Sequence, residues 1–367
     1  MRKNALMSDP LLLSRRQAMA LALGAGASLL FARPSFSNVP NFVSSIWSEA
    51  QARGVSRTIF DQAFAGFTPS QRVMELTTRQ PEMTNTTGQY LGNAVSSARI
   101  STGRSMRGEW SQTLGNIQQR WGVQPEVVLA IWGMETNYGS YMGGNNVIHA
   151  LATLTHGNYR YSFFKNELLT ALQILQAGHI NANAMVGSWA GAMGHTQFMP
   201  SSFVSYAVDY NGNGRRDIWT SIPDALASAA NYLKEHGWRN GETWGYEVQL
   251  PGNFDYARAW SAGRQSLSQW ESMGIRRVGG RAFPRPGDQA TIFMPSGGDG
   301  PVFLMLPNFD VIKRYNNSNN YALAVGHLAD RIIGGGSFAN SWPANETALN
   351  RAQRTELQTL LNRRGFD

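Results

Sequence analysis

Helical periodicity is the feature that most restricts the fold of this chain. Between residues 41 and 67, apolar side chains recur three or four positions apart, and Gly54 interrupts the pattern just before Ser56, a residue suited to cap a helix. The same spacing predicts further helices over 86–120, 124–136, 161–177, 201–208 and 223–236. Pro125 and Pro200 stand where helices can begin. This long region is therefore expected to be dominantly α-helical.

The pattern changes near Gly241. Segments 243–251, 289–297 and 300–309 are rich in β-branched and aromatic residues and are bounded by Gly and Pro, as short strands are. Helical spacing returns at 321–333. The order predicts a mainly α fold of the α+β class, in which a small β-containing part follows a long helical part.

Composition excludes several kinds of site. The chain has no cysteine, so a disulfide framework, a thiolate metal site and a cysteine nucleophile are all ruled out, and no cysteine near the N-terminus is available for a lipid anchor. The formal net charge is +8, half of it within residues 1–37, and no dense Lys/Arg stripe with interleaved aromatics is present. We therefore expect no nucleic-acid partner. We expect a monomer that works near an anionic polymer such as a cell wall.

The N-terminus resembles an export signal. Arg15 and Arg16 precede an apolar run over 18–31, which is shorter than the roughly 20 residues of a membrane-spanning helix and fits the apolar core of a signal peptide. The paired arginines resemble the bacterial twin-arginine signal, and cleavage is expected between Ser37 and Asn38. A buried N-terminal helix is the alternative. The signal predicts delivery to the periplasm.

The C-terminal part has two sections. The Gly-, Ser- and Asn-rich stretch 334–345 has the composition of a linker, and four leucines would line one face of a helix within 346–367. These last 22 residues are too few to bury a core of their own. They either dock on the body or open a second module.

The segment AIWGMETNYGSYMGG, residues 130–144, contains the strongest candidate catalyst. Apolar residues run over 127–132, and then Glu135 appears, followed by Thr-Asn-Tyr-Gly. A carboxyl group at the end of an apolar helix is partly desolvated, and desolvation raises a carboxyl pKa, as a general acid requires. The alternative is a surface glutamate at a fraying helix end.

Two further segments have the polarity of a sugar-binding site. In GSWAGAMGHTQFMPSSF (187–203), Ser188 and Gln197 are placed to bond a sugar or to orient Glu135, although a tightly packed turn would look alike. In RYNNSNNYA (314–322), Tyr315, Asn316 and Tyr321 would form a polar aromatic wall. The alternative there is a capped loop that enters the helix at 321.

Residues 209–224 follow the spacing of a calcium-binding loop. Its candidate oxygen ligands are Asp209, Asn211, Asn213, the backbone carbonyl of Arg215 and, from further along, Asp224. Thr220 stands at the twelfth position, where a calcium loop has Glu. An ordinary Asn-Gly turn is the alternative.

Together these segments resemble the membrane-bound lytic transglycosylase B family, glycoside hydrolase family 103. The resemblance covers about 41–333 and rests on the strings METNYG, GAMGHTQFMPSS, DYNGNGRRDIW and RYNNSNNYA. It implies a lysozyme-like catalytic core with a helical domain and a small β-containing subdomain around a long groove. The expected organisation is a signal peptide over 1–37, a catalytic region over 38–333, a linker over 334–345, and the start of an incomplete peptidoglycan-binding module over 346–367.

The resemblance also assigns roles residue by residue. The family's catalytic acid/base corresponds to Glu135. Its substrate-binding residues correspond to Tyr90, Ser188, Gln197, Tyr232, Tyr315, Asn316 and Tyr321. Its calcium ligands correspond to Asp209, Asn211, Asn213, Arg215 and Asp224, although an Asn stands where the family can have Asp and one extra residue precedes Asp224.

The implied activity is a lytic transglycosylase that acts on peptidoglycan strands. Most glycosidases use two carboxylates, whereas the motifs here offer one that is not in the candidate metal loop. In the family, Glu135 would protonate the oxygen between N-acetylmuramic acid and N-acetylglucosamine, and the muramoyl acetamido group would assist. The carboxylate would then deprotonate the C6 hydroxyl, which closes a 1,6-anhydro ring. The chemistry requires no cofactor, and calcium would be structural.

Three other functions fit part of the sequence. A muramidase would hydrolyse the same bond with water, and a catalytically silent glycan-binding protein would lack turnover. A zinc peptidase is disfavoured because none of the six histidines forms an H-E-x-x-H pair. His195 lies in the Gly-rich motif without a spaced partner ligand, so we interpret it as a structural or groove-lining residue.

Overall fold

The computed structural model describes residues 38–78, 85–349 and 351–365, and the predicted signal peptide lies outside this range. Most of the described chain is helical. The helices before the main sheet are α2 (Val39–Ala52), α3 (Arg57–Phe64), α4 (Gln71–Leu76), α5 (Thr87–Ala94), α6 (Ser97–Glu109), α7 (Ser111–Trp121), α8 (Pro125–Thr136), α9 (Val147–His156), α10 (Tyr161–Gln176), α11 (Pro200–Tyr206) and α12 (Ile222–Glu235).

The rest of the chain combines short strands with helices. Its helices are α13 (Tyr256–Ser261), α14 (Leu267–Ser272), the 3₁₀ turn η2 (Val278–Gly280), α15 (Pro307–Tyr315), α16 (Asn319–Ile332) and α17 (Arg351–Arg363). The strands are β1 (Asn145–Asn146), β2 (Val186–Gly187), β3 (Gly245–Gln249), β4 (Gln265–Ser266), β5 (Arg276–Arg277), β6 (Gln289–Phe293), β7 (Pro295–Gly298) and β8 (Val302–Met305). The expected mainly α fold with a small β part is confirmed.

Local signals explain several helix boundaries. The side chain of Ser56 accepts a hydrogen bond from the amide of Ile59 and caps α3, as predicted. Pro125 and Pro200 occupy the first turns of α8 and α11, where a missing amide hydrogen costs nothing. The helix α9 was not predicted. It is buried on nearly every face, so it lacks the polar face that makes helical periodicity visible.

The main sheet has the strand order β4-β6-β8-β3-β5, and every pairing is antiparallel. Strand β8 is buried on both faces: Phe303 and Met305 join the core of the helical part, and Val302 and Leu304 join a separate core under the sheet. The predicted strand over 300–309 is too long. It ends at Met305, because Pro307 begins α15.

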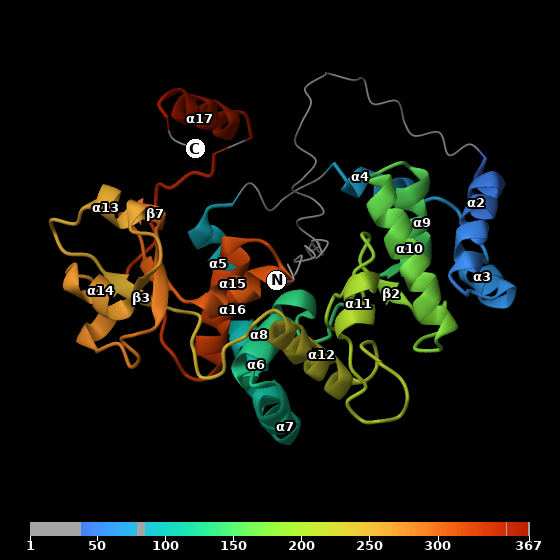
Figure 1. Ribbon diagram of the computed structural model, residues 1–367, viewed down its shortest axis with the longest axis horizontal. Helices are drawn as coiled ribbons and strands as arrows, with labels where there is room; N and C mark the ends of the chain where they lie inside the picture. The colour runs from blue at the N-terminus through green and yellow to red at the C-terminus, as the bar shows by residue number, and fades with distance from the viewer. Residues whose placement is uncertain (1–37, 79–84, 350, 366–367) are drawn as a thin grey trace, which may run out of the picture.

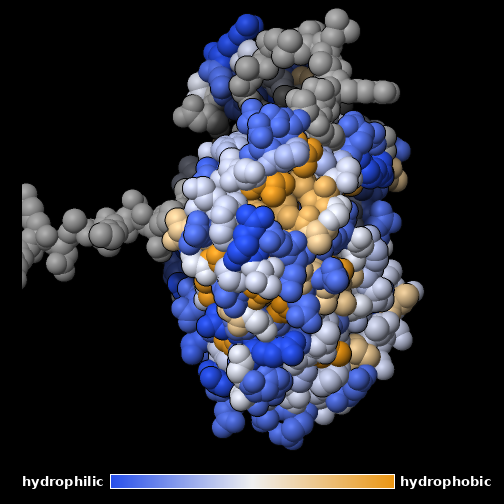
Figure 2. All heavy atoms as spheres, turned by 90° about the vertical axis from the view of Figure 1, so that its right-hand side faces the viewer, coloured by the Kyte–Doolittle hydropathy of each residue, from blue (hydrophilic) through white to orange (hydrophobic). Residues whose placement is uncertain are grey.

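The helical part and the sheet lie side by side along the long axis of the molecule. In Figure 1, the sheet with α13 and α14 forms one end, α2, α3, α9 and α10 form the other, and α8 lies near the middle. Helix α8 packs against α6, α7, α12 and α16. Figure 2 shows the end built by the N-terminal helices, where hydrophobic residues form several separate groups, the largest in the upper half, within a mostly hydrophilic surface.

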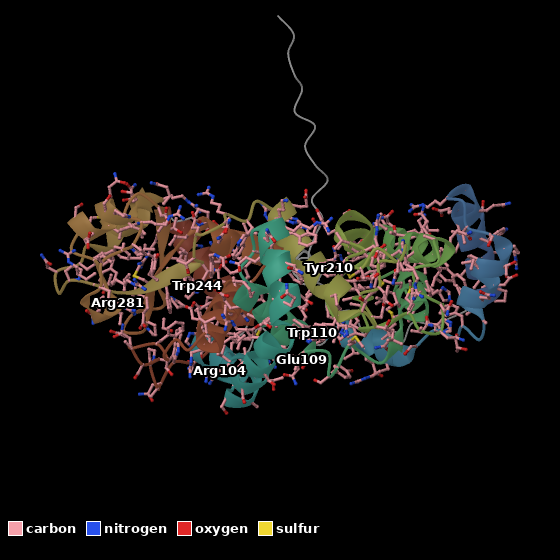
Figure 3. The ribbon with its side chains drawn as sticks, turned by 90° about the horizontal axis from the view of Figure 1, so that it is seen from below. Arg104, Glu109, Trp110, Tyr210, Trp244 and Arg281 are labelled. Carbon is pink, nitrogen blue, oxygen red and sulfur yellow. The ribbon has the colours of Figure 1, made fainter. Side chains whose placement is uncertain are left out.

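Trp244 joins the sheet to the central helices. Its indole Nε1 donates to Asp330 Oδ2 on α16 at 3.1 Å, and Figure 3 shows it between the β end and the helical centre.

Within the described range, no helix is long and apolar enough to cross a membrane.

The C-terminal segments differ in how they meet the body. The stretch predicted as a linker packs on it, with Phe338 and Trp342 against the helical core. Helix α17 stands away from the body in Figure 1, and its Leu357, Leu360 and Leu361 are exposed.

Candidate active site

Glu135 lies in the last turn of the largely buried helix α8. Residues 127–133 of α8 are buried, whereas Glu135 is half-exposed. The helix ends at Asn137, which has φ +48°, and Tyr138 follows with φ +58°. Two consecutive residues with side chains in the left-handed region store backbone strain, which is typical of functional sites. The chain therefore turns sharply just after Glu135.

A buried phenol holds the Glu135 carboxylate. The hydroxyl of Tyr321, a residue of α16 that is only 2% exposed, donates to Glu135 Oε1 at 2.7 Å. Burial raises the pKa of Tyr321 well above its usual range, and the negative charge of Glu135 raises it further. The phenol therefore stays protonated and remains a hydrogen-bond donor at neutral pH.

Two more tyrosines complete a cluster around Glu135, which we call the phenol cluster: Tyr90, Tyr315 and Tyr321. Burial raises the pKa of Tyr315 well above its usual range, and the negative charge of Glu135 raises it further. The phenols of Tyr315 and Tyr90 both contribute to the raised pKa of Tyr321, so each of them lies on the side of Tyr321. The structure thus brings together predicted residues from α5, α8, α15 and α16.

The Gly-rich segment 187–200 packs beside the end of α8. Gln197 Nε2 donates to the carbonyls of Met142 at 3.0 Å and Gly194 at 2.9 Å, and Gln197 itself has φ +52°. Ser188 Oγ accepts from the amides of Ala190 and Ala192. These bonds fix the shape of the segment and tie it to the turn that follows Glu135.

Tyr232 and Tyr315 connect the Gly-rich segment to the segment 314–316. Tyr232 is 7% exposed, its hydroxyl donates to the carbonyl of Arg314 at 2.6 Å, and its ring lies 4.9 Å from that of Tyr315. The hydroxyl of Tyr315 donates to the carbonyl of Thr196 at 2.7 Å. The two tyrosines thus join the 314–316 segment to the Gly-rich segment.

Asn316 offers a polar atom for a ligand. Its side chain is 7% exposed, and Oδ1 has no hydrogen-bond partner among the residues that the structure describes. A buried acceptor without a partner is costly unless a ligand or water satisfies it. Asn316 directly follows Tyr315 at the end of α15, so its backbone adjoins a residue of the phenol cluster.

His195 is a supporting residue whose partner the sequence did not reveal. Trp132 Nε1 donates to His195 Nδ1 at 3.0 Å, and the Thr136 hydroxyl donates to the His195 carbonyl at 3.3 Å. Burial lowers the pKa of His195, which keeps the ring neutral and able to accept at Nδ1. Trp132 and Thr136 flank Glu135 on α8, so His195 holds this helix end against the Gly-rich segment.

Tyr141 is an aromatic residue beside the site that the sequence reasoning missed. It is 72% exposed, and its amide donates to the carbonyl of Thr136 at 3.1 Å. The carbonyl of the next residue, Met142, accepts the bond from Gln197. In the sequence, the signal that could have identified it is an aromatic residue shortly after Glu135 and just before the glycine pair at 143–144.

The candidate calcium loop lies between α11 and α12, and its Ile218 carbonyl accepts from the amide of His195 in the Gly-rich segment at 2.9 Å. Asp209 accepts from the amides of Gly212, Asn213 and Gly214, and the fully buried Asp224 accepts from those of Tyr210 and Asp217.

The candidate ligands of this loop are all oxygen atoms, which suits calcium. In the described residues, however, no three His, Cys, Asp or Glu side chains come together to hold a metal ion. The loop therefore fits calcium in the chemistry of its ligands, with few of the charges that make such sites tight.

Comparisons with known proteins agree with this geometry. Residues 38–330 match the family model described as the transglycosylase SLT domain. Membrane-bound lytic murein transglycosylase B of Escherichia coli (strain K12) is 34% identical over 254 residues, which cover 66% of this chain and 66% of that protein. This chain thus matches about two thirds of that relative's length.

Solved structures give the same result. SltB3 from Pseudomonas aeruginosa, in complex with NAG-anhNAM-pentapeptide, has a TM-score of 0.86 and 46% identity, covering 91% of this chain and 88% of that one. Escherichia coli Slt35 in complex with calcium has a TM-score of 0.68 and 30% identity, covering 82% and 94%.

Proposed function

The chain belongs to the transglycosylase SLT domain family, and on this basis we propose that it is a peptidoglycan lytic transglycosylase in which Glu135 is the single acid/base catalyst. The observation that carries the proposal is the contact of Tyr321 with Glu135, 2.7 Å long, inside the phenol cluster. It places one oriented carboxylate among buried hydroxyl groups. This is the arrangement that a single acid/base catalyst needs.

The proposed reaction proceeds in two steps. Glu135 in its acid form protonates the glycosidic oxygen between N-acetylmuramic acid and N-acetylglucosamine. The bond between that oxygen and C1 of the muramoyl residue breaks, and the acetamido oxygen of the same residue bonds to C1. The Glu135 carboxylate then removes the proton of the C6 hydroxyl. That oxygen forms a bond to C1, the acetamido oxygen leaves C1, and a 1,6-anhydro ring results. The catalyst ends in its acid form, and no water is consumed.

The buried acids of the described chain support a single catalyst. Glu167, which is 2% exposed, accepts from the amide and the hydroxyl of Ser201 at 2.9 and 2.7 Å. Asp224 is bonded within the loop that follows α11. Among the described residues, Glu135 is the only acid whose charge raises the pKa of either Tyr315 or Tyr321. A second carboxylate for an ordinary glycosidase mechanism is therefore not evident beside it.

The experiment that tests the role of Glu135 is its replacement by Gln. General acid/base catalysis contributes on the order of 10²–10⁴ in rate. We therefore expect Glu135→Gln to lower kcat by at least about 10³, because one residue performs both proton transfers. Muropeptide release from purified sacculi measures the rate, and circular dichroism monitors the fold.

Glu126→Gln is the matched control, because Glu126 lies in the first turn of the same helix. We expect this variant to keep the wild-type rate. If Glu135→Gln retained a rate within a few fold of wild type, another residue would have to be the acid.

The substrate-binding role that we propose covers Tyr90, Ser188, Gln197, Tyr232, Tyr315, Asn316 and Tyr321. SltB3 has been solved with NAG-anhNAM-pentapeptide and with NAG-NAM-pentapeptide, and it is similar over most of this chain. The phenol cluster and the Asn316 acceptor would contact the sugars. Ser188, Gln197 and Tyr232 would act mainly by shaping the segments around them, as their hydrogen bonds indicate.

A structural calcium site is a further part of the proposal. Its ligands would be Asp209, Asn211, Asn213, Arg215 and Asp224, with Arg215 acting through its backbone carbonyl. The calcium in the Slt35 structure and the all-oxygen donor set support it. Calcium would stabilise the loop and take no part in bond cleavage.

The proposed site of action is the periplasm. The twin arginines Arg15 and Arg16 and the apolar run that follows support export of the folded protein. Replacement of both arginines by lysine should keep the protein in the cytoplasm, as immunoblots of cell fractions would reveal. Normal periplasmic delivery of that variant would instead indicate the general secretory route.

A further inference from the structure

The segment 337–346, which we call the C-terminal strap, is bonded to the β end of the molecule. The two carboxylate oxygens of Glu247, on β3, accept from the amides of Ala339 at 2.8 Å and Asn340 at 2.9 Å. Ser296, on β7, donates to Glu346 at 2.8 Å. The strap is thus held by polar contacts at its middle and its end, although its composition suggested a linker.

Aromatic contacts hold the start of the strap. The Phe338 ring stacks on His327 of α16 at 3.9 Å between centroids and lies 4.8 Å from Phe303 of β8. Trp342 lies 6.5 Å from the same Phe303. The strap therefore covers the junction between α16 and the sheet.

The strap also reaches α5, through Trp342. A Cβ atom placed on Gly88 would lie 2.7 Å from Cγ and 2.8 Å from Cβ of Trp342. These atoms are at the base of the indole, so the ring cannot move aside without moving the strap. The beginning of α5 is also bonded to α16, because the Thr87 hydroxyl donates to Asn320 Oδ1 at 2.9 Å. Only glycine at position 88 permits this close approach.

Helical geometry connects this contact to the catalytic cluster. Successive residues of an α-helix are about 100° apart, so Gly88 and Tyr90 point to nearly opposite sides of α5. Tyr90 packs against the helical core, α5 contacts α16, which carries Tyr321, and the Tyr90 phenol contributes to the raised pKa of Tyr321. Helix α5 therefore packs against the strap on one side and carries Tyr90 of the phenol cluster on the other.

We propose that Trp342 is a positioning residue, which acts through α5 to place Tyr90 in the substrate-binding site. The inference rests on the proposed role of Tyr90 as a substrate-binding residue. A helix of two turns has little stability of its own, so its position depends on what packs against it. Loss of the indole lets α5 shift, and a misplacement of about 1 Å costs up to about 10²-fold in rate.

A double-mutant cycle tests the route through Tyr90. We expect Trp342→Ala to lower kcat/KM on peptidoglycan strands by on the order of tenfold, mainly through KM, because Tyr90 contacts the substrate in both ground and transition states. In a Tyr90→Ala background the same change should have almost no further effect, since residues that act through one another are not additive. Equal losses in both backgrounds would overturn the proposal.

Gly88→Ala approaches the same contact from the other side. Its added methyl group should displace the strap and reproduce the rise in KM. In a Gly88→Ala/Trp342→Ala protein the methyl group has room, so the combined loss should be smaller than the product of the two single losses. Wild-type KM in Gly88→Ala would contradict the close packing on which the proposal depends.

Two controls separate positioning from loss of stability and from loss of turnover. Phe254→Ala removes a partly buried aromatic residue of the β core, far from α5 in the chain, and should lower the unfolding temperature while leaving KM unchanged. The Trp342→Ala and Tyr90→Ala cycle is also repeated in the Glu135→Gln background, where the affinity for purified glycan strands is measured instead of the rate. If wild-type protein released no anhydro products, the proposed function would fail, whereas non-additive binding would still support the role of Trp342.

Discussion

The contact between Tyr321 and Glu135 joins two residues that are far apart in the sequence. Tyr321 and Glu135 are 186 positions apart in the chain, and the bond between them is 2.7 Å long. The phenol is buried, whereas the carboxylate is half-exposed. The bond from Tyr321 therefore fixes the orientation of the Glu135 carboxylate.

The Tyr321 hydroxyl should matter for kcat more than for KM. A hydrogen bond to a charged group contributes about 1.5–3 kcal/mol, which corresponds to roughly ten- to hundredfold in rate. We expect Tyr321→Phe to lower kcat by that range and to change KM little, because the ring remains. Initial rates on soluble glycan strands across substrate concentration give both constants.

Tyr161→Phe provides the control, because Tyr161 is an exposed tyrosine on α10. It should leave both constants unchanged. A Tyr321→Phe enzyme with wild-type kcat would show that Glu135 needs no orientation from this phenol.

At the scale of residues, the sequence was informative where a motif exposes its chemistry. Glu135 follows a run of apolar residues, and the structure places it in the predicted position at the end of α8. The bond of Trp132 to His195 was not predictable, because it joins two motifs 63 positions apart whose residues look like ordinary core. Three-dimensional pairing of this kind leaves no local pattern.

At the scale of elements, periodicity failed where an element lacks a polar face. Helix α9 is one case, and strand β8 is another: its run Val302–Met305 is buried on both faces and shows no alternation. The predicted strand also ran past Pro307, although a proline in this position begins α15. Amphipathic elements such as α12 were predicted within one or two residues.

The loop between α11 and α12 makes a prediction of its own. We expect millimolar calcium to raise the unfolding temperature relative to chelator, because a ligand present at about 100 times its Kd adds roughly 2.7 kcal/mol to the free energy of unfolding. Differential scanning fluorimetry measures the shift. Asp209→Asn should remove it without changing kcat, and equal unfolding temperatures with calcium and with chelator would reject the site.

Asp330, on α16, is expected to make the stability of the protein depend on pH. Burial raises the pKa of Asp330 to about 7, and the hydrogen bond from Trp244 opposes this only in part. Since the folded-state value lies above the unfolded value of about 3.9, the contribution to stability is complete below pH 4 and is lost as pH rises through 7. Asp330→Asn stays neutral and should therefore be increasingly more stable than wild type from pH 4 to pH 8.

Unfolding temperatures of the two proteins at each pH, taken as a difference, remove the effect of the other titrating groups. A difference that does not change between pH 4 and pH 8 would show that Asp330 titrates normally. The expected trend is opposite to that of a salt-bridged carboxylate, whose contribution is lost on acidification.

At the scale of the whole molecule, the helix that carries Glu135 packs against elements from several parts of the chain. Helix α8 packs on α6, α7, α12 and α16, the Gly-rich segment closes its end through His195, and the C-terminal strap reaches the site through α5. The order of the motifs along the sequence indicated the family and the class of fold. It did not indicate that the supposed linker is part of the folded body.

The most direct test of the account is the chemistry of the product. The C6 hydroxyl belongs to the same sugar as the reacting carbon, and well-oriented intramolecular groups reach effective concentrations on the order of 10⁵ M or more, so it should outcompete water. Mass spectrometry of sacculus digests should therefore show muropeptides that end in 1,6-anhydro-N-acetylmuramic acid, lighter by one water and resistant to borohydride. Fragments with reducible ends would contradict the account and would mean that a residue near Glu135 activates water.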